Sequence, residues 1–169
     1  MEKILETERL VLRKFNLQDT AFIIELLNSP GWLEYIGDRN VHTDEDARNY
    51  LLNGPMKSYE LNGYGLAMVE MKTGHTPIGM CGIIRRDTLE YPDIGFAFLP
   101  EFIGKGYGYE IASATLTYAR DILQLPCIAA ITTPTNRPSI KLVEKIGLQF
   151  KKEFSFPDTE EVLLFFTNG

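Results

Sequence analysis

The stretch best suited to chemistry carries three glycines at alternate positions, Gly104, Gly106 and Gly108, between a strand-like and a helix-like segment. Glycines at such a turn adopt positive φ angles readily and let backbone N–H groups approach a ligand closely. The first N–H groups of the following helix have no partner within the helix. Together with the helix dipole they favour an anion such as phosphate. Lys105 adds a positive charge, so we predict a phosphate-binding turn.

Two common phosphate-binding motifs do not fit this spacing. A Walker loop ends in Gly-Lys followed by Ser or Thr, whereas Gly106 follows Lys105 here. The dinucleotide fingerprint is G-x-G-x-x-G, whereas these glycines are spaced G-x-G-x-G. Both motifs are rejected, and a generic site for another phosphorylated ligand remains an alternative.

Hydrophobic periodicity predicts the elements that position this turn. Strands are expected over residues 4–15, 64–71, 78–85, 93–99, 127–132, 148–154 and 162–166, and helices over 19–27, 32–36, 43–52 with a further turn to 59, 109–123 and 138–146. Short turns join the three strands between residues 64 and 99, which implies an antiparallel meander. Residues 1–169 are therefore expected to form one α/β (α+β) domain, whose mixed, mostly antiparallel sheet of about seven strands is flanked by helices.

Composition and charge limit the partners. Hydrophobic residues make up 44% and charged residues 24% of 169, as in ordinary globular proteins. The net charge is −6 and the basic pairs Arg85-Arg86 and Lys151-Lys152 are isolated, so no nucleic-acid partner is expected, and a small amine suits the acidic chain better. No apolar run approaches the roughly 20 residues of a membrane-spanning helix, and residues 1–6 lack the apolar run of a secretion signal. We expect a cytoplasmic protein with no membrane partner.

The cysteines and histidines predict neither a disulfide framework nor a metal site. Cys81 and Cys127 lie in strand-like apolar runs, where buried, reduced thiols are expected. His42 and His75 lie far apart, without cysteines or carboxylates at ligand spacing. We expect no bound metal.

The segment Ile103-Gly104-Lys105-Gly106-Tyr107-Gly108 resembles the acetyl-coenzyme A signature, Q/R-x-x-G-x-G/A, of the GCN5-related N-acetyltransferases, the GNAT family. Segments 7–13 and 93–96, and the block from Asn136 to Ser139 followed by Glu-Lys-Ile-Gly-Leu at 144–148, resemble its RimJ/RimL-like branch, typified by ribosomal-protein N-terminal acetyltransferases. Ile103 replaces the usual Gln or Arg, and that branch often has an apolar residue there. The resemblance covers almost the whole chain and implies a single-domain GNAT fold.

The resemblance also implies how acetyl-coenzyme A is bound. Backbone amides from Gly104 to Tyr109 would hold the pyrophosphate, in a cofactor-binding segment that comprises Ile103, Gly104, Lys105, Gly106, Tyr107, Gly108 and Tyr109. The backbone at Phe96 and Phe98 would pair with the pantetheine arm as if it were an extra strand, and could polarise the thioester carbonyl. Asn136 and Ser139 would contact the cofactor from the next helix, although both residue types also cap helices.

The acid and base are less clearly marked. Many GNAT enzymes have a tyrosine acid seven residues after the asparagine, whereas this chain has Val143; Ser139 is the substitute that the branch suggests. A thiol with a pKa of about 8.5 can also leave as its anion. Candidate bases or positioning groups are Asp93, Glu101 and Glu160, although such carboxylates more often lie solvated at the surface. A route through water remains equally open.

The acceptor pocket is expected between the amino-terminal helices and the carboxy-terminal strands. Trp32, Tyr35 and Tyr64, with Tyr59, are candidate walls, although such aromatic residues more often belong to the core. The resemblance implies direct acetyl transfer to a primary amine, either a protein N-terminus or a small molecule. The alternative is a non-catalytic acyl-coenzyme A sensor. Exposed strand edges near the carboxy terminus could pair two chains in a homodimer.

Overall fold

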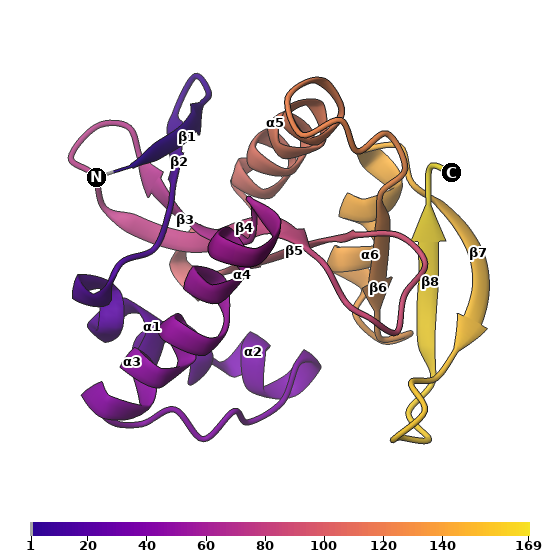
Figure 1. Ribbon diagram of the computed structural model, residues 1–169, viewed down its shortest axis with the longest axis horizontal. Coiled ribbons are helices and arrows are strands. Elements are labelled where there is room, and N and C mark those ends of the chain that lie inside the picture. Colours follow the sequence, from indigo (N-terminus) through magenta and orange to yellow (C-terminus); the bar gives the residue numbers. More distant parts are fainter. Residues whose placement is uncertain (1) are drawn as a thin grey trace.

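An eight-stranded sheet, in the order β1-β2-β3-β4-β5-β6-β8-β7, organises the computed structural model, which describes residues 2–169 (Figure 1). Its strands are β1 Lys3–Glu6, β2 Leu10–Arg13, β3 Leu66–Met71, β4 Pro77–Ile84, β5 Asp93–Phe98, β6 Ala129–Thr132, β7 Gln149–Phe154 and β8 Leu163–Thr167. The α-helices are α1 Thr20–Leu27, α2 Pro30–Tyr35, α3 Asp44–Asn53, α4 Pro55–Asn62, α5 Tyr107–Asp121 and α6 Arg137–Lys145, with short 3-10 helices η1 Leu17–Asp19 and η2 Pro100–Phe102.

The expected α/β class and the antiparallel meander are confirmed: β3, β4 and β5 pair antiparallel in sequence order. The expected single strand over residues 4–15 is wrong. Residues 3–13 form a hairpin, because Thr7 turns the chain: its N–H donates to the Leu10 carbonyl at 2.9 Å and its Oγ1 accepts from the Leu10 N–H at 3.1 Å. This turn contains neither glycine nor proline, so the hydrophobic periodicity of residues 4–15 gives no sign of it. The sheet therefore has eight strands.

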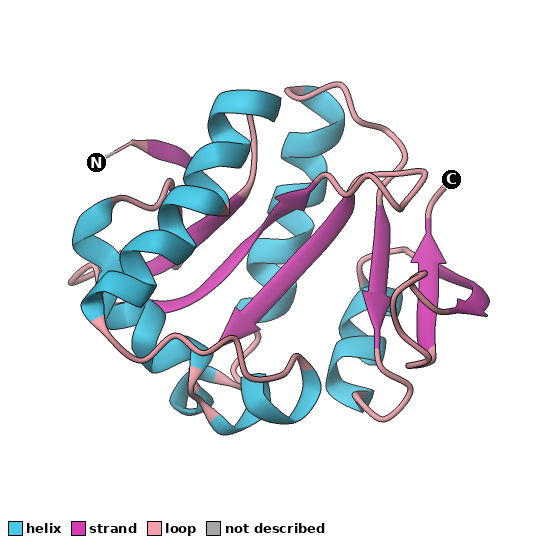
Figure 2. Ribbon diagram, turned by 60° about the horizontal axis from the view of Figure 1, so that its bottom comes forward, coloured by secondary structure: helices cyan, strands magenta, loops and turns pink. Residues whose placement is uncertain are grey.

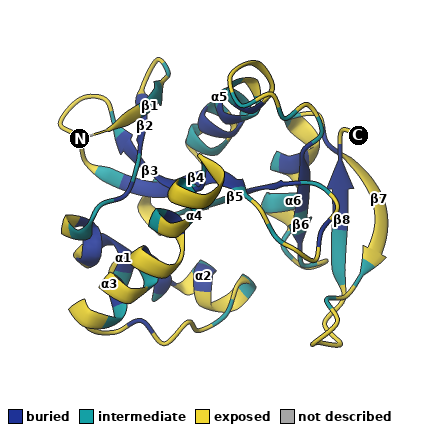
Figure 3. Ribbon diagram, in the orientation of Figure 1, coloured by how far each residue is buried: buried dark blue, intermediate teal, exposed yellow. Residues whose placement is uncertain are grey.

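Helices cover both faces of the sheet. Figures 1 and 2 show α1 to α4 gathered on one face and α5 on the other. On the first face, side chains of α1 such as Ile23 pack with Met68 and Met80 of the sheet. On the second face, Ile111 and Ala112 of α5 pack with Cys81 and Ile94, among others. Figure 3 shows that the central strands are buried, whereas β7 at the edge is exposed along most of its length.

The sheet opens between β5 and β6. These strands are parallel, and within residues 2–169 they pair at one position, Asp93 with Ala129. Figure 2 shows them starting close together and diverging toward their carboxyl ends. The edge of β5 that faces β6 is therefore unpaired beyond its first residue. A strand edge without a partner inside a sheet is a place where an extended ligand can add to the backbone.

The two cysteines differ in placement. Cys81 lies in β4 and is fully buried, and burial raises the pKa of its thiol to about 12. Cys127 lies before β6 and is half-buried, so the expectation of a second buried strand cysteine is wrong. The helices described are all too short or too polar to cross a membrane. Within residues 2–169, no three His, Cys, Asp or Glu side chains gather in a metal-binding arrangement.

Candidate active site

The three glycines of the predicted phosphate-binding turn serve two different purposes. Gly104 and Gly106 have φ angles of +82° and +84°, which only glycine adopts without strain. Gly108 is helical instead, and a Cβ there would lie 3.1 Å from Cδ2 of Leu142 in α6. Two glycines therefore shape the turn, and the third lets α5 approach α6.

The turn leads directly into an uncapped helix N-terminus. Gly106 is the N-cap of α5 and supplies no side-chain hydrogen bond, and the first bond within the helix runs from the Glu110 N–H to the Gly106 carbonyl at 3.1 Å. The N–H groups of Tyr107, Gly108 and Tyr109 consequently lack helical partners. Gly104 to Gly106 are exposed, so the turn that precedes these donors is open to solvent, and Lys105 adds a positive charge to it. The local geometry suits an anion.

Arg9 brings a second cation to the turn, which sequence reasoning missed. Its Nη1 donates to the Lys105 carbonyl at 3.2 Å, and its Cζ lies 4.4 Å from the centroid of the Tyr107 ring. Its Nε donates to Glu110 Oε1 at 2.7 Å, while Glu110 Oε2 accepts from the Arg9 N–H and from Thr7 Oγ1. Partial burial would raise the pKa of Glu110, but these hydrogen bonds outweigh it and lower the pKa. The carboxylate therefore fastens the β1–β2 turn to α5.

The unpaired edge of β5 carries backbone groups of Phe96 and Phe98. The Leu99 N–H donates to the Ile78 carbonyl at 2.9 Å, just beyond the Gly79–Phe98 pair, so that pair is of the non-hydrogen-bonded kind. In an antiparallel ladder the two kinds of pair alternate, so the backbone groups of Phe98 and Phe96 point away from β4. They face the opening between β5 and β6. Their side chains pack against the core, so each residue can belong to the core through its side chain while its backbone stays free for a ligand.

The segment from β6 to α6 forms the opposite side of this opening. Asn136 caps α6, since its Oδ1 accepts from the Ser139 N–H at 3.3 Å. Ser139 is half-buried. Thr133, just after β6, has a buried Oγ1 with no hydrogen-bond partner within residues 2–169. Because a buried hydroxyl without a partner is costly, this donor suits a ligand in the opening. Sequence reasoning missed Thr133, which belongs to no motif.

The three candidate carboxylates lie in different surroundings. Asp93, at the closed end of the opening, is 1% exposed, and Arg86 Nε donates to its Oδ1 at 3.0 Å. Burial raises the pKa of Asp93, while the Arg86 charge limits the rise. The expectation of a solvated surface acid is therefore wrong for Asp93. It holds for Glu101 in η2 and for Glu160 before β8, which are both exposed.

A cavity of about 310 Å³ lies between the α3–α4 corner and the ends of β3 and β4. It is lined by Tyr50, Asn53, Gly54, Pro55, Lys57, Ser58, Leu61, Asn62, Gly65, Leu66, Ile84 and Arg85. A Cβ on Gly95 of β5 would lie 3.0 Å from Ile84 Cδ1 and 3.4 Å from Leu66 Cδ2. Ile84 and Leu66 therefore line the cavity and also lie against β5 at Gly95, the residue before Phe96.

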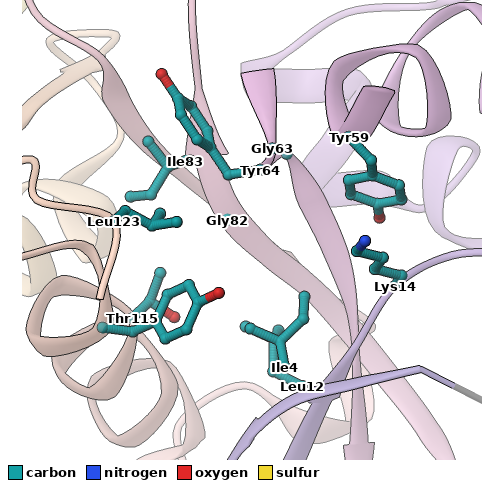
Figure 4. Close-up of a pocket in the computed structure, with 12 residues that line it drawn as sticks. Ile4, Leu12, Lys14, Tyr59, Gly63, Tyr64, Gly82, Ile83, Thr115 and Leu123 are labelled. Carbon is teal, nitrogen blue, oxygen red and sulfur yellow. The ribbon is translucent and has the colours of Figure 1, made fainter. Parts of the chain in front are cut away.

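The expected aromatic walls do not line this cavity. Trp32 is 7% exposed and packs in the core beneath α1 to α4, with its indole N–H buried and unpartnered among the described residues. Tyr35 is half-buried at the end of α2. Tyr64 and Tyr59 line a separate cavity of about 30 Å³ near α5 (Figure 4), which has room for about one water molecule. The Tyr59 hydroxyl donates to the Leu66 carbonyl and accepts from the Phe15 N–H, so its role there is structural.

The acetyltransferase (GNAT) domain family matches residues 9–149, which include the glycine turn, the open edge of β5 and the start of α6. This chain belongs to the GNAT acetyltransferases. The expected GNAT fold is thereby confirmed, and so is acetyltransferase activity as the class of function. GNAT domains bind acetyl-coenzyme A, and the unpaired amides, the unpartnered Thr133 hydroxyl and the unpaired β5 edge suit such a ligand.

Relatives support the assignment to the GNAT family. The uncharacterized N-acetyltransferase YnaD of Bacillus subtilis is 31% identical over 150 residues, which span 86% of this chain and 85% of that protein. A GNAT-family acetyltransferase of Bacillus anthracis is 28% identical in structure-based comparison, covers 96% of both chains and superposes with a TM-score of 0.79. The aminoglycoside acetyltransferase AAC(6')-Ib, solved in complex with coenzyme A, shares the fold with a TM-score of 0.76, 19% identity and 94% coverage of both chains.

Proposed function

We propose that this GNAT protein transfers an acetyl group from acetyl-coenzyme A directly to a primary amine. The observation that carries the proposal is that the three unpartnered amides at the start of α5 and the unpaired edge of β5 belong to one continuous segment of chain. The former suits a pyrophosphate and the latter an extended arm. A ligand with both parts therefore fits along β5, with its reactive end toward Asp93.

Each part of the opening has an assigned role in binding. The N–H groups of residues 107–109 hold the pyrophosphate, with Lys105 and Arg9 adding positive charge. The backbone of Phe96 and Phe98 pairs with the pantetheine arm. Asn136, Ser139 and Thr133 contact that arm from the other side of the opening. Arg9 and Thr133 thus join the binding residues that the sequence predicts.

The chemistry that the cofactor supplies is an acetyl thioester. The neutral amine nitrogen attacks the thioester carbonyl carbon, a C–N bond forms, the C–S bond breaks, and the sulfur leaves with the electron pair. A backbone N–H of the β5 edge stabilises the oxyanion. Asp93 accepts the proton that the amine loses, directly or through water, because its raised pKa makes it a better base than an ordinary aspartate.

The thiolate needs little help to leave. Its pKa of about 8.5 allows departure as the anion, with Ser139 as the group placed to donate a proton. Deprotonating a lysine-type amine at pH 7 costs roughly 4–5 kcal/mol, whereas an α-amine costs about 1 kcal/mol. A low-pKa amine is therefore the easier acceptor. The segments 7–13, 93–96 and 136–148 further favour the RimJ/RimL-like branch, with a protein N-terminus or a small amine as acceptor.

Calorimetric titration with acetyl-coenzyme A tests the binding site. The variant Gly106→Asp places a negative side chain at the turn, and Gly74→Asp is its matched control, because Gly74 has a φ of +83° in the distant β3–β4 turn. We expect micromolar binding that Gly106→Asp abolishes and Gly74→Asp retains. No binding to the folded wild type would reject the proposal.

A sensor without catalysis is the alternative, since no tyrosine acid is present. Thiol release measured against a panel of amines separates the two functions. Binding of acetyl-coenzyme A without release for any amine would favour the sensor. The exposed edge of β7 offers a pairing edge for a homodimer, which sedimentation velocity would test.

A further inference from the structure

The cavity beside β5 has a local charge opposite to that of the whole chain. Lys57 of α4 and Arg85, just after β4, both line it, and none of its lining residues is an aspartate or glutamate. The other polar side chains of the lining are uncharged hydroxyls and amides. The net charge of the chain is nevertheless −6. Overall charge, which suggests a cationic partner, therefore misleads about this cavity.

Both cations are available to a ligand. Lys57 and Arg85 are exposed, and within residues 2–169 neither forms an ion pair with a carboxylate. The Arg85 Nη1 donates to the Glu90 carbonyl at 3.4 Å, which restrains the side chain and leaves its charge uncompensated. A guanidinium has five N–H donors, so most of them remain free.

The cavity also lies where an acceptor would be needed. Its Ile84 and Leu66 side chains face Gly95 of β5, and the backbone of the next residue, Phe96, points into the opening. Asp93 pairs with Ile84 across β4 and β5, so the proposed base lies beside the same wall. An amine in the cavity therefore lies next to the stretch of β5 that is proposed to bind the cofactor, and Asp93, which is buried and does not line the cavity, would take its proton through water.

We infer that the acceptor is a small amine that also carries an anionic group, a carboxylate or a phosphate, which Lys57 and Arg85 bind. The inference rests on the proposed function, since it names the substrate class of that site. The volume of about 310 Å³ is at the small end of the range for ligand pockets. A polyamine would bring further positive charge against Lys57 and Arg85, which charge complementarity disfavours.

Matched acceptors test the inference. Alanyl-alanine is compared with its C-terminal amide, and phosphoethanolamine with ethanolamine, with spermidine as the polycation. The initial rate of thiol release gives kcat/KM, calculated per neutral amine. We expect kcat/KM for the anionic member of at least one pair to exceed that of its uncharged partner about tenfold, since two exposed ion pairs that each contribute a few-fold multiply to about that factor. The advantage should shrink with added salt. The pair that responds distinguishes a carboxylate from a phosphate.

Paired variants locate the effect. Lys57→Gln with Arg85→Gln should lower kcat/KM for the anionic acceptor to about that of its uncharged partner. The control carries Lys151→Gln on β7 and Arg120→Gln on α5, which removes the same charge away from the cavity. Thermal unfolding of both double variants checks that they fold. Equal kcat/KM for anionic and uncharged acceptors in an active wild-type enzyme, or faster turnover of spermidine, would overturn the inference and leave the proposed function intact.

A binding experiment keeps the inference testable without turnover. N-acetyl-alanyl-alanine and N-acetylphosphoethanolamine resemble products and are titrated calorimetrically against wild type and the Lys57/Arg85 double variant, with the corresponding uncharged compounds alongside. We expect at least one anionic compound to bind wild type about tenfold more tightly than its uncharged partner. If acetyl-coenzyme A does not bind, the proposed function fails whatever this result. Equal binding of anionic and uncharged compounds overturns the inference alone.

Discussion

Arg9 binds Glu110 across 101 residues of sequence, with Nε 2.7 Å from Oε1, and the same guanidinium reaches the Lys105 carbonyl. The amino-terminal hairpin is thereby fastened to the first turn of α5. A Cβ on Gly106 would lie 3.4 Å from Arg9 Nη2, so the cation stands directly beside the glycine turn. Glu110, an acid in the first turn of α5 that complements the helix dipole, also neutralises part of this charge.

Arg9→Ala should weaken acetyl-coenzyme A binding several-fold while lowering the free energy of unfolding only slightly, because the Arg9 side chain is exposed. Calorimetric titration and thermal unfolding measure the two effects. Arg120→Ala is the control, since Arg120 forms an exposed pair with Asp121 far along α5. Equal affinities in the two variants would remove Arg9 from the binding site.

Gly106→Ala and Gly108→Leu should destabilise the protein for different reasons. At Gly106 the φ of +84° strains any Cβ, at a cost of about 1–2 kcal/mol. At Gly108 a large side chain meets Leu142 and pushes α6 away from α5. The double variant Gly108→Leu/Leu142→Ala should therefore recover part of the lost stability, whereas Gly106→Ala/Leu142→Ala should not. Chemical denaturation measures all four variants.

Asp93→Asn should change both the rate and the pH dependence of stability. Because burial raises the pKa of Asp93 in the folded state, folding favours its protonated form. Its contribution to stability is present below the unfolded pKa of about 3.9 and is lost as pH rises through the folded pKa. The difference in unfolding free energy between wild type and variant should therefore fall as pH rises above about 4.

The activity of the Asp93→Asn variant gives an independent test of the base. With acetyl-coenzyme A and a reactive amine, kcat should fall about 10²-fold or more if Asp93 removes the proton. The acid limb of the wild-type pH–rate profile should lie above the pH range of an ordinary aspartate. An unchanged kcat in a folded variant would assign the proton transfer to water.

Arg13→Met should be the most damaging of these changes to stability. Arg13 is buried in β2 and binds Asp19 with both Nη atoms and Glu70 with Nε, at 2.8–2.9 Å. Removing the cation leaves two buried carboxylates unpaired, which should cost about 3–5 kcal/mol. Lys3→Met removes an exposed pair and should change the unfolding free energy by less than about 1 kcal/mol.

The parts of the site that are local in sequence could be predicted, and those that depend on tertiary contacts could not. The glycine turn, β5 and α5 follow one another along the chain, so composition and periodicity are sufficient to find them. Arg9 approaches the glycine turn because β1 and β2 form a hairpin. The turn of that hairpin contains no glycine or proline, so the sequence gives no sign of it. Lys57 and Arg85 meet at the cavity from a helix and a strand end, and neither belongs to a motif. Trp32 and Tyr64 looked suitable by residue type, but Trp32 packs in the core with α1 and α3, and Tyr64 packs against the core on the α5 side of the sheet.

Among the residues that the structure describes, the single pairing of Asp93 with Ala129 leaves two blocks of sheet, β1 to β5 and β6 to β8, joined within the sheet at one backbone position. A ligand whose arm forms backbone hydrogen bonds with β5 and contacts the β6–α6 segment would act as an added strand that holds the two blocks together. Occupancy should then slow amide hydrogen exchange in β6 and β8, well beyond the residues that the ligand touches. Binding of the acyl donor would therefore be detectable as reduced backbone flexibility in the carboxy-terminal third of the protein.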